Sequence, residues 1–196
     1  MTPVSADPIA LFLSCRADAV EAGAPMDGMV AVLATASPDG APSARCVLIK
    51  EVGPEGFFVY TNYQSRKGLE LDANPRAALC MHWVETGIQF RIEGSVSRAT
   101  DARSDAYFAS RPRESQLAGW ASDQSEPLAS RDALLARFAD AESRFEGRAV
   151  DRPAHWGGYR ILPERIEHWQ NGAHRLHDRF LYVREGAGWR VTRLSP

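Results

Sequence analysis

The stretch HRLHDRF, residues 174–180, gathers positive charge in a pattern that suggests an anion-binding surface. If it forms a β-strand, successive side chains point to opposite faces, so Arg175, His177 and Arg179 share one face. Like charges at neighbouring positions repel one another unless solvent screens them or an anion lies opposite. We therefore expect this face to meet an anionic ligand. The alternative is an exposed basic strand edge that discourages aggregation.

A second candidate anion site is the segment YTNYQSRKG, where a strand is followed by a helix that Ser65 caps. The N-terminus of a helix favours anions because its first N–H groups are free and its dipole is positive there. Arg66 and Lys67 add two charges at the same place. A phosphate group suits this arrangement, although an ordinary solvated helix start has the same residues.

A third candidate is DAYFASRPRES, in which Tyr107 and Arg111 are four residues apart and so share one face of the expected helix. Ser115 follows shortly afterwards. Phenol, guanidinium and hydroxyl groups all donate hydrogen bonds to phosphate oxygens. The alternative is a packed tyrosine beside a solvated arginine. In RCVLIK, Arg45 and Lys50 bracket an apolar strand, and alone they are explained as strand-end charges.

Together these segments supply many hydrogen-bond donors without a matching acidic cluster. That balance suits a ligand with more than one phosphate group, or two phosphorylated ligands. Each charge-assisted hydrogen bond contributes about 1.5 to 3 kcal/mol, so three or four of them hold a small molecule with roughly micromolar affinity.

The composition is that of an ordinary folded protein. The chain has 196 residues, of which 44% are apolar and 24% charged, with a formal net charge of −2. These values exclude a disordered, collagenous or disulfide-stapled chain and fit a single domain. The near-neutral charge offers no overall field for nucleic acid or an anionic membrane, so we expect neither as a partner.

Three cysteines, Cys15, Cys46 and Cys80, cannot all pair within the chain, and no cysteine–histidine cluster suggests a metal site. The N-terminus lacks the basic residues of a signal peptide ahead of its short apolar run. No window approaches the roughly 20 apolar residues that a membrane helix needs. We therefore expect a cytoplasmic protein without a metal.

The elements predicted from periodicity and turn residues form one domain over residues 1–196. A leading helix region, 1–24, starts with the cap Asp7 and Pro8. The helical insertion 100–147 holds two helices separated by a polar loop at 113–127. Strands and one short helix occupy the middle of the chain, with strands at 29–36, 43–52, 56–62, 77–83 and 88–99 and the helix at 65–75.

The C-terminal strands lie within residues 155–196. We predict two strands in GGYRIL and RIEHWQ, a two-residue hairpin turn at Asn171–Gly172, and two more strands in AHRLHDRFLYVRE and GWRVTRL. Seven or eight strands and three or four helices result. One antiparallel sheet or barrel with peripheral helices is the simplest architecture for them.

Five motifs together resemble one known family. They are RCVLIK, FVYTNYQSRKG, YFASRPRESQLAGWASDQS, WGGYR and EHWQNGAHRLHDRFLY. The chain resembles pyridoxamine 5'-phosphate oxidase, a flavin enzyme that makes pyridoxal 5'-phosphate, in the same order and spacing from about Ala6 to Pro196. The resemblance implies a mainly β fold, an antiparallel split β-barrel with flanking helices that works as a homodimer and binds FMN at the interface with residues of both chains.

The resemblance also implies the site residues. The FMN contacts would be Arg45, Val47, Leu48, Lys50, Tyr60, Thr61, Arg66, Lys67, Gln89, Gln124, Ser125, Trp169 and Arg179. The substrate phosphate would be bound by Lys50, Tyr107, Arg111 and Ser115. Arg175 and His177 would be the catalytic residues and would lie against the pyridine ring of the substrate.

The implied reaction is the oxidation of pyridoxamine 5'-phosphate and pyridoxine 5'-phosphate by hydride transfer to FMN, with O₂ reduced to H₂O₂. Two alternatives stay open. One is a related FMN oxidase acting on another compound, such as a phenazine precursor, and the other is a non-catalytic module that binds flavin or pyridoxal phosphate.

Three departures from the family pattern bear on substrate closure and turnover. The chain starts almost at its first helix, where many relatives carry a leading segment that folds over the substrate. Ile88 stands where relatives commonly have Arg, and His168 where Phe is usual. Because His168 and Trp169 are adjacent on a strand, we expect one of them to face out.

Overall fold

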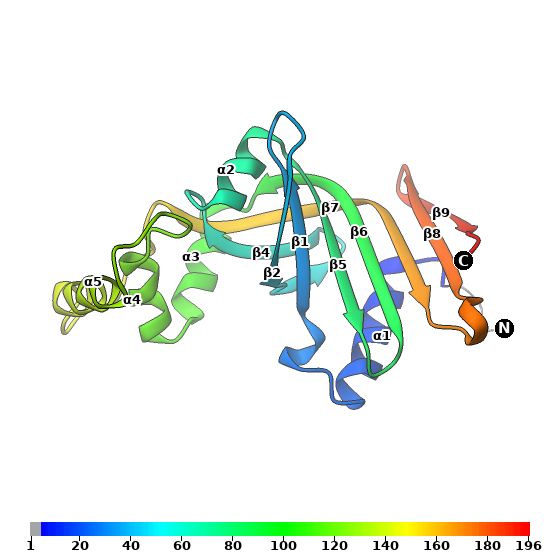
Figure 1. Ribbon diagram of the computed structural model, residues 1–196, viewed down its shortest axis with the longest axis horizontal. Coiled ribbons are helices and arrows are strands. Elements are labelled where there is room, and N and C mark those ends of the chain that lie inside the picture. Colours follow the sequence, from blue (N-terminus) through cyan, green and yellow to red (C-terminus); the bar gives the residue numbers. More distant parts are fainter. Residues whose placement is uncertain (1–4) are drawn as a thin grey trace.

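The computed structural model describes residues 5–196, so the first four residues of the predicted leading region 1–24 lie outside the described part (Figure 1). This part of the chain forms nine strands and five α-helices, more than the seven or eight strands and three or four helices predicted. The strands are β1 (Val30–Ala36), β2 (Pro42–Leu48), β3 (Glu51–Gly53), β4 (Gly56–Asn62), β5 (Arg76–Trp83), β6 (Ile88–Arg98), β7 (Trp156–Gln170), β8 (Asp178–Glu185) and β9 (Gly188–Arg193). The helices are α1 (Pro8–Glu21), α2 (Arg66–Ala73), α3 (Asp101–Ser110), α4 (Arg113–Ala121) and α5 (Arg131–Arg144), with short 3₁₀ turns η1 (Met26–Gly28) and η2 (Ala173–Arg175).

All nine strands join one curled antiparallel sheet (Figure 1). Seven of them follow the order β2-β1-β5-β6-β7-β4-β3, while β8 pairs with β7 and β9 pairs with β8. β6 pairs with β7 along its whole length, and the register shifts between Glu93 and Gly94, near Pro163. On its other edge β7 pairs with β4 in its first half and with β8 in its second. GGYRIL and RIEHWQ therefore form one long irregular strand, and the prediction of two strands is wrong. Proline donates no ladder hydrogen bond, which is why the irregularity lies at Pro163.

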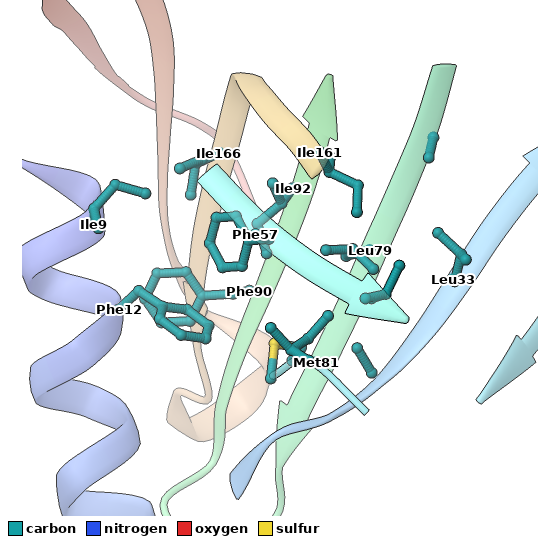
Figure 2. Packing of buried hydrophobic residues seen from close by; sticks show 14 of the residues in the cluster. Ile9, Phe12, Leu33, Phe57, Leu79, Met81, Phe90, Ile92, Ile161 and Ile166 are labelled. Atoms are coloured by element: carbon teal, nitrogen blue, oxygen red, sulfur yellow. The ribbon is translucent and has the colours of Figure 1, made fainter. Parts of the chain in front are cut away.

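Helix α1 covers the inner face of the sheet. The Asp7 carboxylate accepts a hydrogen bond from the Ile9 N–H at 2.8 Å, so the predicted cap is confirmed. Phe12 projects into the core, where its ring centroid lies 5.2 Å from those of both Phe57 and Phe90 in edge-to-face geometry (Figure 2). Burying each such side chain stabilises the fold by about 1.5 to 3 kcal/mol. No helix within residues 5–196 is both long enough and apolar enough to cross a bilayer.

A second, smaller core lies where α3, α4 and α5 meet the start of β7. Phe108, Leu117 and Phe145 are buried there together with Trp156. The polar loop predicted at 113–127 is wrong for residues 113–121, which form α4. Only Leu117 and Ala121 of α4 are buried, so tertiary packing rather than a periodic apolar pattern holds this helix.

The connection between β7 and β8 also differs from the prediction. β7 ends at Gln170 and β8 begins at Asp178, so seven residues replace the predicted two-residue turn. His174 and Arg175 have left-handed backbones, with φ of 56° and 64°. Arg175 and His177 therefore precede the strand and do not alternate along it with Arg179, and the expected single basic face is not formed.

His168 is buried on β7 and Trp169 is half-buried on the opposite face, as their parity predicts. The His168 ring lies 5.1 Å from Phe90 and 6.5 Å from Phe180. Its Nε2 atom is buried without a hydrogen-bond partner within residues 5–196. Burial lowers the pKa of His168, and the negative charge of Asp178 only partly opposes this.

We predict that His168→Phe increases the free energy of unfolding, by about 1 kcal/mol at pH 8, because it removes an unsatisfied buried polar atom. The gain should be larger at pH 5.5. The folded-state pKa of His168 is lowered, so as pH falls below about 6.5 the unfolded chain takes up the proton first and wild-type stability is lost. Urea unfolding at both pH values measures the difference. His82→Phe, at an exposed position of β5, is the matched control. An equal gain at both pH values would contradict the assignment.

Candidate functional site

A cleft of about 510 Å³ lies between the sheet and the α3–α4 region. Ten of the predicted site residues line it, namely Val47, Leu48, Lys50, Tyr60, Thr61, Lys67, Tyr107, Arg111, Ser115 and Gln124. They come from β2, from the loop after it, from β4, from α2 and from the α3–α4 region and its following loop. The three candidate anion segments other than HRLHDRF therefore converge on one place.

One end of the cleft is built around the buried ammonium group of Lys67. Ser65 caps α2 as predicted, accepting a hydrogen bond from the Gly68 N–H at 3.4 Å. Lys67 Nζ donates to Thr61 Oγ1 at 3.1 Å, Ser65 Oγ at 3.0 Å and Gln124 Oε1 at 2.9 Å. All three partners are neutral. Burial, aided by the neighbouring charge of Arg45, lowers the pKa of Lys67 to about 8.

The other end of the cleft holds Arg111. It lies just beyond α3 in extended conformation, so the prediction that Tyr107 and Arg111 share a helix face is wrong, although both line the cleft. Its guanidinium carbon lies 4.6 Å from the ring centroid of Trp156. The Nη1 atom is buried and has no hydrogen-bond partner within residues 5–196. Burial lowers the pKa of Arg111, which indicates that no nearby negative charge offsets its loss of hydration.

Aromatic rings form a wall of the same cleft. Tyr60 and Tyr107 stack at 3.9 Å between ring centroids, and Trp156 lies parallel to them at 5.9 and 6.1 Å. Gly158 permits this packing because a Cβ atom there would lie 2.8 Å from Tyr60 Cε1. Burial and the hydrogen bond that Tyr60 donates to Glu51 raise its pKa, so its hydroxyl stays protonated. Trp156 was missed as a site residue, although the quoted motif WGGYR contains it.

Two predicted FMN ligands are paired with a carboxylate. Arg66 Nε donates to Glu70 Oε1 at 2.9 Å, and Arg45 lies 3.3 Å from Oε2 of the same group. Thr35 and Ser43 each donate to Glu70 Oε2 at 2.5 Å. The expectation that the donors lack acidic partners is therefore wrong for Arg45 and Arg66. The four-residue spacing of Arg66 and Glu70 on a helix was the signal available in the sequence.

The remaining predicted residues lie elsewhere. Gln89, Trp169 and Arg179 are cross-strand neighbours on β6, β7 and β8. The His177 ring lies 4.6 Å from that of Trp169, and Arg175 is exposed. None of these five residues lines the cleft, nor does Ser125, which is exposed with φ 77°.

Arg179 is also paired. Its Nε donates to Glu167 Oε1 at 2.8 Å, and Arg91 pairs with the other oxygen of the same buried carboxylate. Burial of Glu167 opposes its ionisation, but the hydrogen bond from Arg179 and the charge of Arg91 outweigh this and lower its pKa.

Strand β7 separates the two groups of residues. Trp156 at its start belongs to the cleft, and Trp169 near its end belongs to the second group (Figure 1). The two residues are thirteen positions apart, and that much extended chain spans up to about 40 Å. The two groups of residues therefore lie at opposite ends of one long strand.

The donor set of the cleft fits a phosphorylated aromatic ligand. Lys67 is buried, and Arg111 is partly buried with a buried Nη1 atom. Neither has a carboxylate partner in residues 5–196, so the cleft offers two places for an anion. The stacked rings that line the cleft offer a flat apolar surface. Phosphates and a planar ring system are the features of FMN and of a pyridoxal-type substrate.

Comparison with known proteins shows which family the chain belongs to. Residues 27–145 match the pyridoxamine 5'-phosphate oxidase family, and residues 156–196 match the C-terminal dimerisation region of pyridoxine 5'-phosphate oxidase. The chain is 55% identical over 190 residues to pyridoxine/pyridoxamine 5'-phosphate oxidase of Rubrobacter xylanophilus, covering 97% of this chain and 87% of the relative. It is 54% identical over 193 residues to the protein of the same name from Sphingopyxis alaskensis, covering 98% and 89%.

Solved structures agree with the predicted fold class. PhzG from Burkholderia lata, in complex with tetrahydrophenazine-1-carboxylic acid, superposes with a TM-score of 0.92 at 33% identity, covering 100% of this chain and 95% of that one. A pyridoxamine 5'-phosphate oxidase-related, FMN-binding protein from Nostoc punctiforme has a TM-score of 0.76 at 17% identity, covering 98% and 100%. The mainly β prediction is confirmed, and the curled antiparallel sheet with its flanking helices is a split barrel.

We predict that Glu70→Gln lowers the free energy of unfolding at pH 7 by about 2 kcal/mol, because a charged acceptor of four hydrogen bonds becomes neutral. Burial of Glu70 opposes ionisation, but hydrogen bonds from Ser43, Thr35 and Arg66 outweigh it and lower its pKa to about 2. This stability is present above the unfolded pKa of about 4.3 and is lost as pH falls towards 2.

Urea unfolding at pH 7 and pH 3 measures the effect. The difference between wild type and variant should shrink at pH 3. Glu164→Gln, which breaks a more exposed ion pair with Arg76, is the control and should change stability little at either pH. A Glu70→Gln effect no larger than the control would contradict the assignment.

Proposed function

Because the chain belongs to the pyridoxamine 5'-phosphate oxidase family, a family of FMN-dependent oxidoreductases, we propose that it oxidises pyridoxamine 5'-phosphate and pyridoxine 5'-phosphate to pyridoxal 5'-phosphate. One observation carries the proposal most directly. A single cleft holds two cations, the buried Lys67 and the partly buried Arg111, that have no carboxylate partner in residues 5–196, and stacked aromatic rings line the same cleft. We expect it to work in the cytoplasm, as the cysteine content suggests.

In this proposal the Lys67 end binds the FMN phosphate and the Arg111 end binds the substrate phosphate. Lys67 acts with Thr61 and Gln124, which already share hydrogen bonds with it. Arg111 acts with Tyr107 and Ser115, and Lys50 reaches the same cleft from the end of β2. Each charge-assisted hydrogen bond to a phosphate contributes about 1.5 to 3 kcal/mol.

FMN, when bound, would supply the hydride acceptor for the substrate, with O₂ as the final electron acceptor and H₂O₂ as the product. The chain's own residues hold the reacting carbon against the flavin. From the amine, water then releases the aldehyde and ammonia, and from the alcohol the aldehyde forms directly. Arg175 and His177 are proposed to contact the pyridine ring, with Gln89, Trp169 and Arg179 beside the flavin.

We further propose that the two groups of residues meet in a homodimer, where the cleft of one subunit receives the Arg175–His177 loop of its partner. The separation along β7 supports this arrangement, as does the match of residues 156–196 to a dimerisation region.

A second candidate is oxidation of a phenazine precursor, favoured by the likeness to PhzG. The higher identity to the pyridoxine/pyridoxamine oxidases, together with Tyr107, Arg111 and Ser115 in the cleft, favours a phosphorylated substrate.

We predict that the purified protein is yellow and that pyridoxamine 5'-phosphate bleaches its flavin absorbance without oxygen. With air, aldehyde and H₂O₂ should form in equal amounts. Arg111→Leu should raise KM by about 10- to 100-fold through loss of a charged hydrogen bond. Arg131→Leu removes an exposed arginine at the start of α5 and should change nothing.

The other functions give different results. A phenazine-type oxidase would leave the flavin unbleached by the vitamin phosphates, and a non-catalytic module would stay yellow with every substrate. Unchanged kinetics in Arg111→Leu would contradict the substrate-phosphate assignment.

We also predict that mixed dimers show how the site is shared. Pairing an Arg111→Leu chain with an Arg175→Leu chain leaves one intact site if cleft and loop come from different subunits. Pairing the double variant with a wild-type chain then leaves none. Two affinity tags isolate each mixed dimer, and kcat/KM per dimer should recover to about half of wild type only in the first. The reverse pattern would show that each site lies within one chain.

A further inference from the structure

The ring of His177 is fixed by a hydrogen bond within its own loop. The backbone N–H of Gly172 donates to His177 Nδ1 at 3.2 Å. A ring nitrogen that accepts an N–H carries no proton of its own. In the neutral imidazole the single proton must then lie on Nε2, because the partner of one nitrogen decides the state of the other.

Gly172 holds this position because no larger residue fits. A Cβ atom at Gly172 would lie 2.1 Å from the carbonyl oxygen of Leu176, a contact that real side chains do not make. The close approach brings the start and end of the seven-residue loop together, and it places the Gly172 N–H opposite the His177 ring.

The loop is anchored on both sides. The N–H of Asn171 donates to the carbonyl of Gly87 at 2.8 Å, which ties the loop to the β5–β6 turn. Within the loop, the Leu176 N–H donates to the carbonyl of Ala173 at 3.0 Å. His174 and Arg175 occupy left-handed backbone conformations, which are unfavourable for residues other than glycine. A loop that keeps such strain is held by its surroundings in one shape.

The other ring nitrogen is available to a ligand. His177 is half-buried with its ring 4.6 Å from Trp169 and tilted by 43°. Its Nε2 atom makes no hydrogen bond with any residue in the described range 5–196. In the neutral ring this free atom is a donor.

We propose that Gly172 is a positioning residue that holds His177 as the Nε2–H tautomer, so that His177 donates a hydrogen bond to an acceptor atom of the substrate and does not accept a proton through Nε2. The location of the substrate rests on the proposed function, whereas the tautomer does not.

Nitrogen NMR of ¹⁵N-histidine-labelled, FMN-loaded protein at pH 8.5 tests the tautomer directly. The His177→Asn spectrum identifies the His177 signals by their loss. We expect Nε2 to be the protonated nitrogen and Nδ1 the unprotonated one, and we expect Gly172→Ala to shift the population towards the other tautomer. A wild-type ring protonated at Nδ1, or an unchanged ring in a folded Gly172→Ala protein, would overturn the proposal.

Kinetics test the donor role with a matched pair of variants. The amide nitrogen of Gln in His177→Gln can occupy the place of Nε2 and donate, whereas the shorter Asn in His177→Asn reaches only the place of Nδ1. We expect kcat/KM for pyridoxine 5'-phosphate to be about tenfold higher in the Gln variant than in the Asn variant. Equal losses would refute the donor role. If wild-type protein oxidises neither vitamin phosphate, the proposed function fails, while the NMR result still decides the tautomer.

Discussion

The structure depends on two cations, the buried Lys67 and the partly buried Arg111, that have no negative partner in the described chain. Removing an ammonium or guanidinium group from water costs several kcal/mol unless an opposite charge compensates it. Lys67 has only neutral partners and Arg111 has a buried nitrogen with none, and burial lowers the pKa of both. A chain selected only for stability would pair or expose these groups. An anion that binds only the folded state stabilises it. The desolvation cost of these two cations is therefore consistent with a site for phosphates.

The arginines that pair with a carboxylate have a different role. Arg45 and Arg66 share the carboxylate of Glu70, and Arg179 shares Glu167 with Arg91. Each carboxylate is buried, and its hydrogen bonds hold it ionised. These pairs fix the direction of the guanidinium groups before any ligand arrives, which reduces the ordering cost of binding. The chain thus combines cations that a carboxylate holds in place, such as Arg45, with cations that have no carboxylate partner in residues 5–196, such as Lys67.

Local signals in the sequence were enough for most of the fold. The caps at Asp7 and Ser65 were found because the chemistry of a helix start is confined to a few neighbouring residues. Helix α4 was missed because only Leu117 and Ala121 are buried, and two apolar positions are too few to show a helical period. The Asn–Gly hairpin signal at 171–172 was overridden by the close approach of Gly172 to Leu176. In the site, the motifs contained ten residues that line the cleft. They did not reveal the link from Glu70 to Thr35 and Ser43, which joins residues far apart in the sequence.

The two groups of predicted site residues lie at different ends of β7, which supports the proposal that two chains share one site. Trp156 and Trp169 are ordered on the same strand, and an extended strand cannot fold back to bring its ends together. Pairing with β6 from Tyr159 to Gln170 fixes that separation further. The loop that carries Arg175 and His177 lies beyond the distant end, next to Trp169, and the strain at His174 and Arg175 keeps its shape. A rigid loop that lies far from its own cleft suits the cleft of a second subunit. There its fixed shape would place Arg175 and His177 against a ligand that the cleft already binds.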